Sequence, residues 1–234
     1  MSGKNVLLTG STKGIGLAIY NELKSSGYRV FGCSRANIEQ KDYLMVDLTD
    51  TKNAEILYSA AKEAMGNIDI LINNAGIYLY TPIEKTSADE LKRLVNLNFI
   101  TPQLLCGYVA ADMKKNKWGR IINIGSISGA VGEANASAYA ATKSGLSGLT
   151  KSLALELAQY NVTVNQINPG WVDTNLSNEA LSEEEKLETL DVIPQRRFIE
   201  PKEIAKLCSY LISDDAKGLT GQGINLCAGL SCGA

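Results

Sequence analysis

The stretch that decides the fold is TGSTKGIG, residues 9–16, which follows a short strand-like apolar run and precedes a segment of helical period. A helix that starts here offers unpaired backbone N–H groups and the positive end of its dipole to a pyrophosphate. Gly10 permits a sharp turn, Gly14 lets the backbone approach the phosphates, and Gly16 lets helix and strand pack closely. The spacing differs from G-x-G-x-x-G, so this is a variant glycine loop in the same topological place.

Outward from this loop, short apolar runs alternate with longer segments of helical period. The inner runs are nearly continuous in Val, Ile and Leu, as expected when helices cover both faces of a parallel sheet. With no linker or repeat, residues 1–234 are predicted to form a single α/β domain, a Rossmann fold with a doubly wound seven-stranded parallel sheet. The expected strands are 5–9, 28–33, 43–46, 68–73, 120–126, 162–167 and 223–227, and the expected helices include 15–25, 87–117 and 139–160.

One segment, between Thr174 and Pro201, breaks this alternation because it is polar and acidic. Within it, SEEE at residues 182–185 has the pattern of a capping box that opens a short helix. A long excursion between two sheet elements is a common place for a substrate lid. We expect residues 175–200 to form such a lid, with a solvated surface helix as the alternative.

Composition limits the chemistry. The chain has no histidine, which excludes Ser-His-Asp and Cys-His triads, imidazole zinc sites and a histidine general base. A net charge of -2 gives no electrostatic reason to expect nucleic acid or an anionic membrane as a partner. No apolar run approaches the ~18 residues of a membrane span. Five cysteines without a C-x-x-C pair, and no signal-peptide pattern, predict a cytoplasmic protein with free thiols and no metal site.

Tyr139 and Lys143 stand at positions i and i+4 of an expected helix and therefore share one face. A free tyrosine has a pKa near 10, and lowering it by about three units requires ~4 kcal/mol. An ammonium group ~4 Å away supplies about that much at an effective dielectric near 20. The pair could therefore replace histidine as acid and base, although such pairs are also common surface contacts. Ser126 ends an expected strand at the carboxyl edge, where ligands bind in open α/β sheets.

Together these motifs resemble the short-chain dehydrogenase/reductase family, whose glycine loop is written T-G-x-x-x-G-x-G, over essentially the whole chain. The general pattern is most similar to 3-oxoacyl-[acyl-carrier-protein] reductases, on GRIINIGS at 119–126, VIPQRR at 192–197, EPKEIA at 200–205 and TGQ at 220–222. The tail departs from the family, with CAG at 227–229 in place of a polar residue and two glycines. The resemblance implies hydride transfer between a nicotinamide cofactor and a carbonyl or secondary alcohol.

The family's four catalytic residues fall on Asn98, Ser126, Tyr139 and Lys143. By the resemblance, Tyr139 donates a proton to the carbonyl oxygen in reduction and accepts it in oxidation, and Ser126 hydrogen-bonds the same oxygen. Lys143 is implied to lower the pKa of Tyr139 and to hold the nicotinamide ribose hydroxyls. Asn98 is implied to hold a water in a proton relay to Lys143, which leaves Asn96 as structural.

The end of the second expected strand predicts the cofactor. An acid there would bind the adenosine 2′-hydroxyl of NAD and repel a 2′-phosphate, but this position is Ser34. Ser34, Arg35 and Lys13 would bind a phosphate through charge-assisted hydrogen bonds, which favours NADP(H), unless the two cations are ordinary surface residues. By the resemblance, Asp47 caps the adenine and PGWVDT at 169–174 fixes the carboxamide. The expected cofactor-binding residues are Gly10, Ser11, Thr12, Lys13, Gly14, Ile15, Gly16, Ser34, Arg35, Asp47, Asn74, Ala75, Gly76, Tyr139, Lys143, Pro169, Gly170, Val172 and Thr174.

The expected substrate is a small carbonyl or alcohol, either free or bound to a carrier protein or coenzyme A. A sugar, steroid-like or secondary-metabolite alcohol stays open, because the lid has few cations for an acidic carrier. A non-catalytic NADP-binding regulator is the alternative from another class. We expect the pocket to be formed by the lid with residues 127–137 and 78–80. The resemblance also implies a homodimer or homotetramer, paired through the helices that begin near Ser87 and Tyr139.

Overall fold

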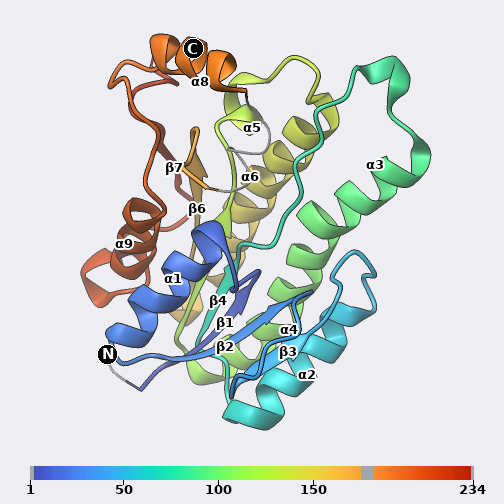
Figure 1. The fold of residues 1–234 in the computed structure, drawn as a ribbon. Helices are drawn as coiled ribbons and strands as arrows, with labels where there is room; N and C mark the ends of the chain where they lie inside the picture. Colours follow the sequence, from blue (N-terminus) through green and yellow to red (C-terminus); the bar gives the residue numbers. More distant parts are fainter. Residues whose placement is uncertain (1–2, 175–181, 233–234) are drawn as a thin grey trace.

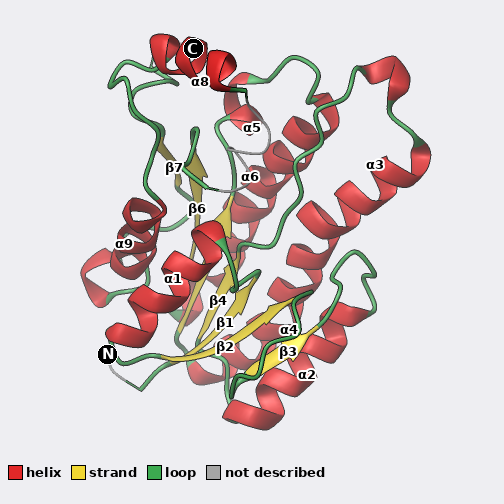
Figure 2. Cartoon of the chain, viewed as in Figure 1, coloured by secondary structure: helices red, strands yellow, loops and turns green. Residues whose placement is uncertain are grey.

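The computed structural model of the chain describes residues 3–174 and 182–232 (Figure 1). A seven-stranded parallel sheet has the order β3-β2-β1-β4-β5-β6-β7, with helices on both faces (Figure 2). The order reverses between β1 and β4, which is the place where doubly wound sheets bind their ligands. The strands are β1 Asn5–Thr9, β2 Arg29–Ser34, β3 Tyr43–Met45, β4 Ile70–Asn73, β5 Gly119–Ile124, β6 Val162–Pro169 and β7 Gly223–Leu226.

The helices divide between the two faces of the sheet. One hydrophobic cluster joins the sheet to α1 and α9, and the other joins it to α2, α4 and α6. Within the described ranges the α-helices are α1 Gly14–Ser25, α2 Asn53–Met65, α3 Ala88–Val95, α4 Thr101–Asn116, α5 Ser128–Val131, α6 Ser137–Leu157, α8 Glu183–Val192 and α9 Pro201–Leu211. Short 3₁₀ helices span Ile83–Lys85, Ala158–Tyr160 and Asp214–Ala216, and a π-helical turn spans Asn96–Ile100.

The first strand shows why its sequence is almost wholly apolar. Val6 and Leu8 point into the cluster that contains α1 and α9, whereas Leu7 points into the cluster that contains α2, α4 and α6. All three side chains are fully buried. Alternate residues of a strand face opposite sides, so a strand covered on both faces needs an apolar residue at every position.

The predicted fold class is confirmed. The seven expected strands are all present, although β5 ends at Ile124, so Ser126 lies just beyond the strand rather than at its end. The long helix expected over 87–117 is present as an unbroken helical stretch over Ala88–Asn116, but its middle, Asn96–Ile100, is a π-helical turn between α3 and α4. Pro102 explains this turn, because it has no N–H to donate to the carbonyl of Asn98.

The helical stretch Ala88–Asn116 is long and apolar enough to cross a membrane by length and composition alone. Half of its most apolar window is buried inside the fold, and its Leu105, Val109 and Met113 belong to the hydrophobic cluster on the sheet. This burial is what the core helix of a packed domain shows.

Candidate active site

The glycine loop is held by backbone packing. The N–H groups of Gly10 and Ser11 both donate to the carbonyl of Cys33 at the end of β2, at 2.9 and 3.1 Å. A Cβ on Gly16 would lie 1.9 Å from the carbonyl oxygen of Gly10, so no side chain fits there. Gly14 opens α1 with a φ of +52°, a conformation that favours glycine. The loop therefore presents the start of α1 at the carboxyl edge of the sheet.

Asn74 fastens this loop to the neighbouring strand. Its side-chain amide donates to the carbonyls of Thr9 and Gly10, at 2.9 and 3.1 Å. The Thr9 hydroxyl in turn accepts the backbone N–H groups of Asn74 and Ala75. The structure thus gives the Asn74 side chain a structural contact, while Asn74 and Gly76 also line the cavity described below.

The adenosine end of the expected cofactor site lies where β2 ends. The Ser34 hydroxyl accepts a hydrogen bond from Thr12 at 2.9 Å and shares another with Tyr43 at 2.7 Å. Arg35 and Lys13 are both exposed. A hydrogen bond from the Thr49 backbone is the largest cause that lowers the pKa of Asp47, and the nearby charge of Arg35 adds to it.

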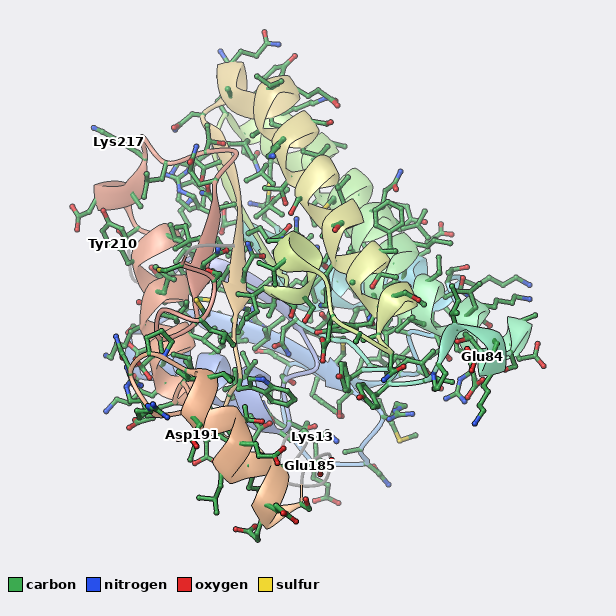
Figure 3. All side chains as sticks on the ribbon, turned by 90° about the horizontal axis from the view of Figure 1, so that it is seen from above. Lys13, Glu84, Glu185, Asp191, Tyr210 and Lys217 are labelled. Carbon is green, nitrogen blue, oxygen red and sulfur yellow. The ribbon has the colours of Figure 1, made fainter. Side chains whose placement is uncertain are left out.

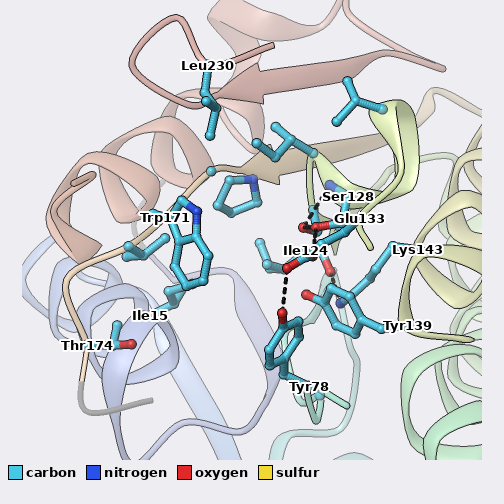
Figure 4. A pocket seen from close by; sticks show the side chains of 18 of the residues that line it. Ile15, Tyr78, Ile124, Ser128, Glu133, Tyr139, Lys143, Trp171, Thr174 and Leu230 are labelled. Atoms are coloured by element: carbon cyan, nitrogen blue, oxygen red, sulfur yellow. Dashed lines mark hydrogen bonds between the residues drawn. The ribbon is translucent and has the colours of Figure 1, made fainter. Parts of the chain in front are cut away.

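A cavity of about 530 Å³ opens at the carboxyl edge of the sheet (Figure 4). It brings together Ser126, Tyr139 and Lys143, which come from the end of β5 and from α6. Ile15 of the glycine loop also lines it. The predicted cofactor residues Asn74, Gly76, Pro169, Gly170, Val172 and Thr174 lie in the same lining, and Gly10, Ser11, Thr12, Lys13, Gly14, Gly16, Ser34, Arg35, Asp47 and Ala75 lie outside it.

The pKa of Tyr139 corrects one sequence-based expectation. Burial raises its pKa to about 12, a hydrogen bond with Ser126 opposes this rise, and the charge of Glu133 adds to it. Lys143, which was expected to lower this pKa, is directed at another group. Its Nζ lies 5.6 Å from the tyrosine ring centroid and donates to the carbonyl of Ile124 at 2.8 Å. Burial of Lys143 lowers its own pKa to about 8.

Asn98 lies in the π-helical turn and is 1% exposed. Its side chain exchanges two hydrogen bonds with the backbone of Ile77, at 2.8 and 2.9 Å. A Cβ on Gly76 would lie 3.3 Å from Asn98 Oδ1 and 3.7 Å from Lys143 Nζ, so both side chains border the same glycine. Asn96 instead donates to the carbonyl of Thr49, away from the cavity, in keeping with the structural role predicted for it.

The segment 169–174 approaches the glycine loop from the end of β6. A Cβ on Gly14 would lie 3.4 Å from the methyl group of Thr174, so the two motifs are neighbours in space. Trp171 lines the cavity and also stacks on Phe198, with ring centroids 6.3 Å apart. The glycine loop, the start of α1 and the cavity thus follow one another along the carboxyl edge of the sheet. This arrangement fits a nicotinamide dinucleotide.

Glu133, a carboxylate that lines this cavity, was not singled out by the sequence analysis. Glu133 accepts hydrogen bonds from the hydroxyls of Tyr78 and Ser128, at 2.5 and 2.7 Å. The Ser128 hydroxyl lies 3.0 Å from that of Ser126. The available signal was that Glu133 is the one charged residue between Ser126 and Tyr139.

The described residues contain no group of three or more acidic or cysteine side chains that could hold a metal ion. Helix α8, which lies in the expected lid, has the expected capping box, in which Ser182 accepts from the N–H of Glu185 and the Glu185 carboxylate accepts from the N–H of Ser182. Val192, the last residue of α8, lines the cavity. Residues 175–181 of the expected lid lie outside the described residues.

Comparison with known proteins adds independent information. A family model for short chain dehydrogenases matches residues 4–185. The chain is 37% identical over 240 residues to the 3-oxoacyl-[acyl-carrier-protein] reductase FabG of Haemophilus influenzae, which covers 98% of this chain and 99% of that protein. It is 34% identical over 232 residues to the 3-oxoacyl-[acyl-carrier-protein] reductase MabA of Mycobacterium tuberculosis, with 98% and 94% covered.

Proposed function

The chain belongs to the short-chain dehydrogenase family and is an oxidoreductase, and from this premise we propose that it reduces a ketone or aldehyde with NADPH. A 3-oxoacyl thioester is the first candidate substrate, because the relatives named above are 3-oxoacyl-[acyl-carrier-protein] reductases. The observation that carries the proposal is the meeting of Ser126, Tyr139 and Lys143 in one cavity beside the start of α1. Oxidation of NADPH with a panel of ketones and 3-oxoacyl thioesters, followed by stopped-flow absorbance, tests it.

In the proposed reaction, Tyr139 donates the proton. A pKa of about 12 keeps its hydroxyl protonated at neutral pH, and a carbonyl oxygen that is becoming an alkoxide is a stronger base than a phenolate. Ser126 hydrogen-bonds the same oxygen and stabilises the developing negative charge. The bound cofactor supplies the hydride. In oxidation the same side chain would act as the phenolate, which a raised pKa makes scarcer at neutral pH.

Lys143 and Asn98 are proposed to assist this step by binding the cofactor and by returning a proton. The Lys143 ammonium has two hydrogens left after its bond to Ile124, and we propose that it binds the ribose hydroxyls of the nicotinamide half. The carbonyl of Asn98 cannot receive the usual helical hydrogen bond from residue 102, because that residue is proline. We propose that this carbonyl holds a water that returns a proton toward Lys143.

The proposed cofactor is NADP(H) rather than NAD(H). Support comes from a serine at the end of β2, within 2.9 Å of the Thr12 hydroxyl in the glycine loop, and from the exposed cations Arg35 and Lys13. A carboxylate in place of Ser34 would repel a 2′-phosphate, and these side chains instead attract it. The dissociation constants of NADPH and NADH, compared by titration, test this choice.

A second candidate is a reductase for a substrate that is not bound to an acidic carrier protein. The lid supports it: its three cations, Lys186, Arg196 and Arg197, are each already in a salt bridge with a carboxylate. Glu185 and Asp191 project from α8 (Figure 3), whose last residue, Val192, lines the cavity. An acidic carrier would meet unfavourable charge there. A higher kcat/KM for a free ketone than for its carrier-bound analogue would favour this candidate.

A non-catalytic NADP-binding regulator is the remaining candidate, and the absence of NADPH oxidation despite tight binding would identify it.

We further propose one domain over residues 1–234, with 175–200 as the substrate lid. We propose a cytoplasmic location, supported by five cysteines that are all free. We also propose a dimer or tetramer, supported by Leu155 on α6, which is 85% exposed. Sedimentation velocity measures the oligomeric state.

A further inference from the structure

Glu133 is a charged group in the substrate part of the cavity that the proposed reaction does not use. It lies between α5 and α6 and faces the cavity (Figure 4). Among the described residues of the lining it is the one carboxylate, and the described salt bridges do not include it. The cation of the lining, Lys143, donates to Ile124 instead. Among the described residues, therefore, no cation is bonded to the negative charge of Glu133.

The position of this carboxylate is set by two hydroxyl groups. Tyr78 donates to one of its oxygens and Ser128 donates to the other, at 2.5 and 2.7 Å. The Tyr78 ring is itself held edge-on against the Tyr139 ring, with centroids 5.0 Å apart. Each carboxylate oxygen can accept two hydrogen bonds, so each keeps one acceptor position for a ligand.

The site is close to the place where the reacting carbonyl is expected. Ser128 Oγ lies 3.0 Å from Ser126 Oγ, so Glu133 is two hydrogen bonds away from the side chain proposed to bind the carbonyl oxygen. A substituent a few bonds from that carbonyl would therefore reach Glu133. Apolar side chains, among them Ile127, Val131 and Val192, also line the cavity.

We propose that Glu133 determines substrate specificity, by selecting ketones that carry a hydrogen-bond donor, a hydroxyl or ammonium group, a few bonds from the carbonyl. This inference rests on the proposed reductase activity and, within it, favours the second candidate, a ketone that is not carrier-bound, over a 3-oxoacyl thioester, whose thioester group offers no hydrogen-bond donor. A substrate that closes the cavity displaces water from the carboxylate, which is favourable only when the substrate replaces the lost hydrogen bonds. A substrate with a carboxylate in the same place meets like charge and is rejected.

Four ketones of similar size test the proposal: pentan-2-one as reference, 4-hydroxybutan-2-one, 4-aminobutan-2-one and acetoacetate. For the wild-type protein, kcat/KM for the hydroxyl and ammonium ketones should exceed that for pentan-2-one by at least about tenfold, as expected of a hydrogen bond to a charged group. Acetoacetate should fall below the reference. A preference for only one of the two donor ketones identifies which group the site takes.

Substitution of Glu133 should change these ratios. Glu133→Gln should lower the ammonium preference by about tenfold and the hydroxyl preference less, because a neutral amide still accepts a hydrogen bond. Glu133→Asp keeps the charge but withdraws it by one methylene, so its ratios should be intermediate. Glu84→Gln is the matched control: it removes the same charge from an exposed site far from α8 (Figure 3) and should keep the wild-type ratios.

Two outcomes would overturn the proposal. In one, Glu133→Gln leaves all three ratios as they are in the wild type. In the other, it lowers kcat equally for every ketone, which would mean that Glu133 only positions Ser126 through Ser128. A binding measurement separates this proposal from the proposed function. Calorimetric titration of 4-aminobutan-2-ol, butane-1,3-diol and pentan-2-ol in the presence of NADPH reports the same preference without turnover, because both partners are already reduced, and equal affinities would also refute the proposal.

Discussion

The cofactor side and the substrate side of the cavity are built by different means. On the cofactor side, backbone meets backbone: a Cβ on Gly16 would lie 1.9 Å from the Gly10 carbonyl, and Asn74 ties the loop to β4. On the substrate side, side chains from separate loops meet, as where Tyr78 and Ser128 bind Glu133. The difference teaches that the shape of the glycine loop depends on close backbone approach, whereas the shape and charge of the substrate side depend on side-chain contacts. The following changes test this contrast.

The largest expected effect separates the chemical step from cofactor binding. Tyr139→Phe removes the proposed proton donor, and kcat/KM for ketone reduction should fall by roughly 10³-fold, within the usual range for a general acid. The dissociation constant of NADPH, measured by fluorescence titration, should change little. The exposed Tyr210 provides the control, since Tyr210→Phe should keep wild-type turnover. Unchanged turnover in Tyr139→Phe would refute the assignment of the proton donor.

The second effect concerns the buried charge beneath the substrate side. The folded pKa of Lys143 is about 8, below its ordinary value of 10.5, so between these pH values the unfolded chain binds more protons at this residue than the folded chain. The charged Lys143 therefore lowers the free energy of unfolding at neutral pH. This cost disappears as the pH rises from about 8 to 10.5, so the free energy of unfolding increases by up to about 3 kcal/mol. The measurement is the free energy of unfolding in urea for wild type minus Lys143→Met, at pH 7, 8.5 and 10. A difference that stays constant with pH would contradict the lowered pKa.

The third change is made on the cofactor side. Gly16→Ala places a methyl group against the Gly10 carbonyl, so the loop must move, and the protein should lose about 1–3 kcal/mol of stability together with NADPH affinity. Gly148→Ala is the matched control, because that helical glycine is exposed and has open space around its Cα. It should stabilise the protein by about 0.5–1 kcal/mol. Thermal unfolding with and without NADPH compares the two variants.

The smallest effect should be confined to the adenosine end. Arg35→Ala should weaken NADPH binding by about tenfold, the loss of roughly one charge-assisted hydrogen bond, and should leave NADH binding unchanged. Titration with both cofactors measures this difference. An equal loss for both would mean that Arg35 supports the loop rather than the 2′-phosphate.

Much of the fold and part of the site could be predicted from local patterns. Short apolar runs between segments of helical period indicated the strands, and the capping box at Ser87 marked the start of α3. The i, i+4 spacing placed Tyr139 and Lys143 on one helix face. These signals are readable because each depends on residues that are close in sequence. The parallel strands then bring their carboxyl ends to one edge, so the meeting of Ser126 with α6 follows from topology.

Other features depend on contacts between distant segments. The pKa of Tyr139 was expected to fall, but it rises, first because of burial and then because of the charge of Glu133. The bonds from Asn98 to Ile77 and from Tyr78 to Glu133 span 21 and 55 residues of sequence. The spacing of residues within a short segment gives no sign of contacts between residues so far apart in the sequence.

The sequence by itself determined the architecture, the glycine loop and the absence of imidazole chemistry, because periodicity, glycine spacing and composition act over short stretches of chain. Only the tertiary structure decided the electrostatics of the cavity: the raised pKa of Tyr139, the lowered pKa of Lys143 and the carboxylate of Glu133 beside the expected carbonyl site. The physical reason is that burial and charge pairing depend on every segment that packs around a group, and those segments meet only when the chain is folded.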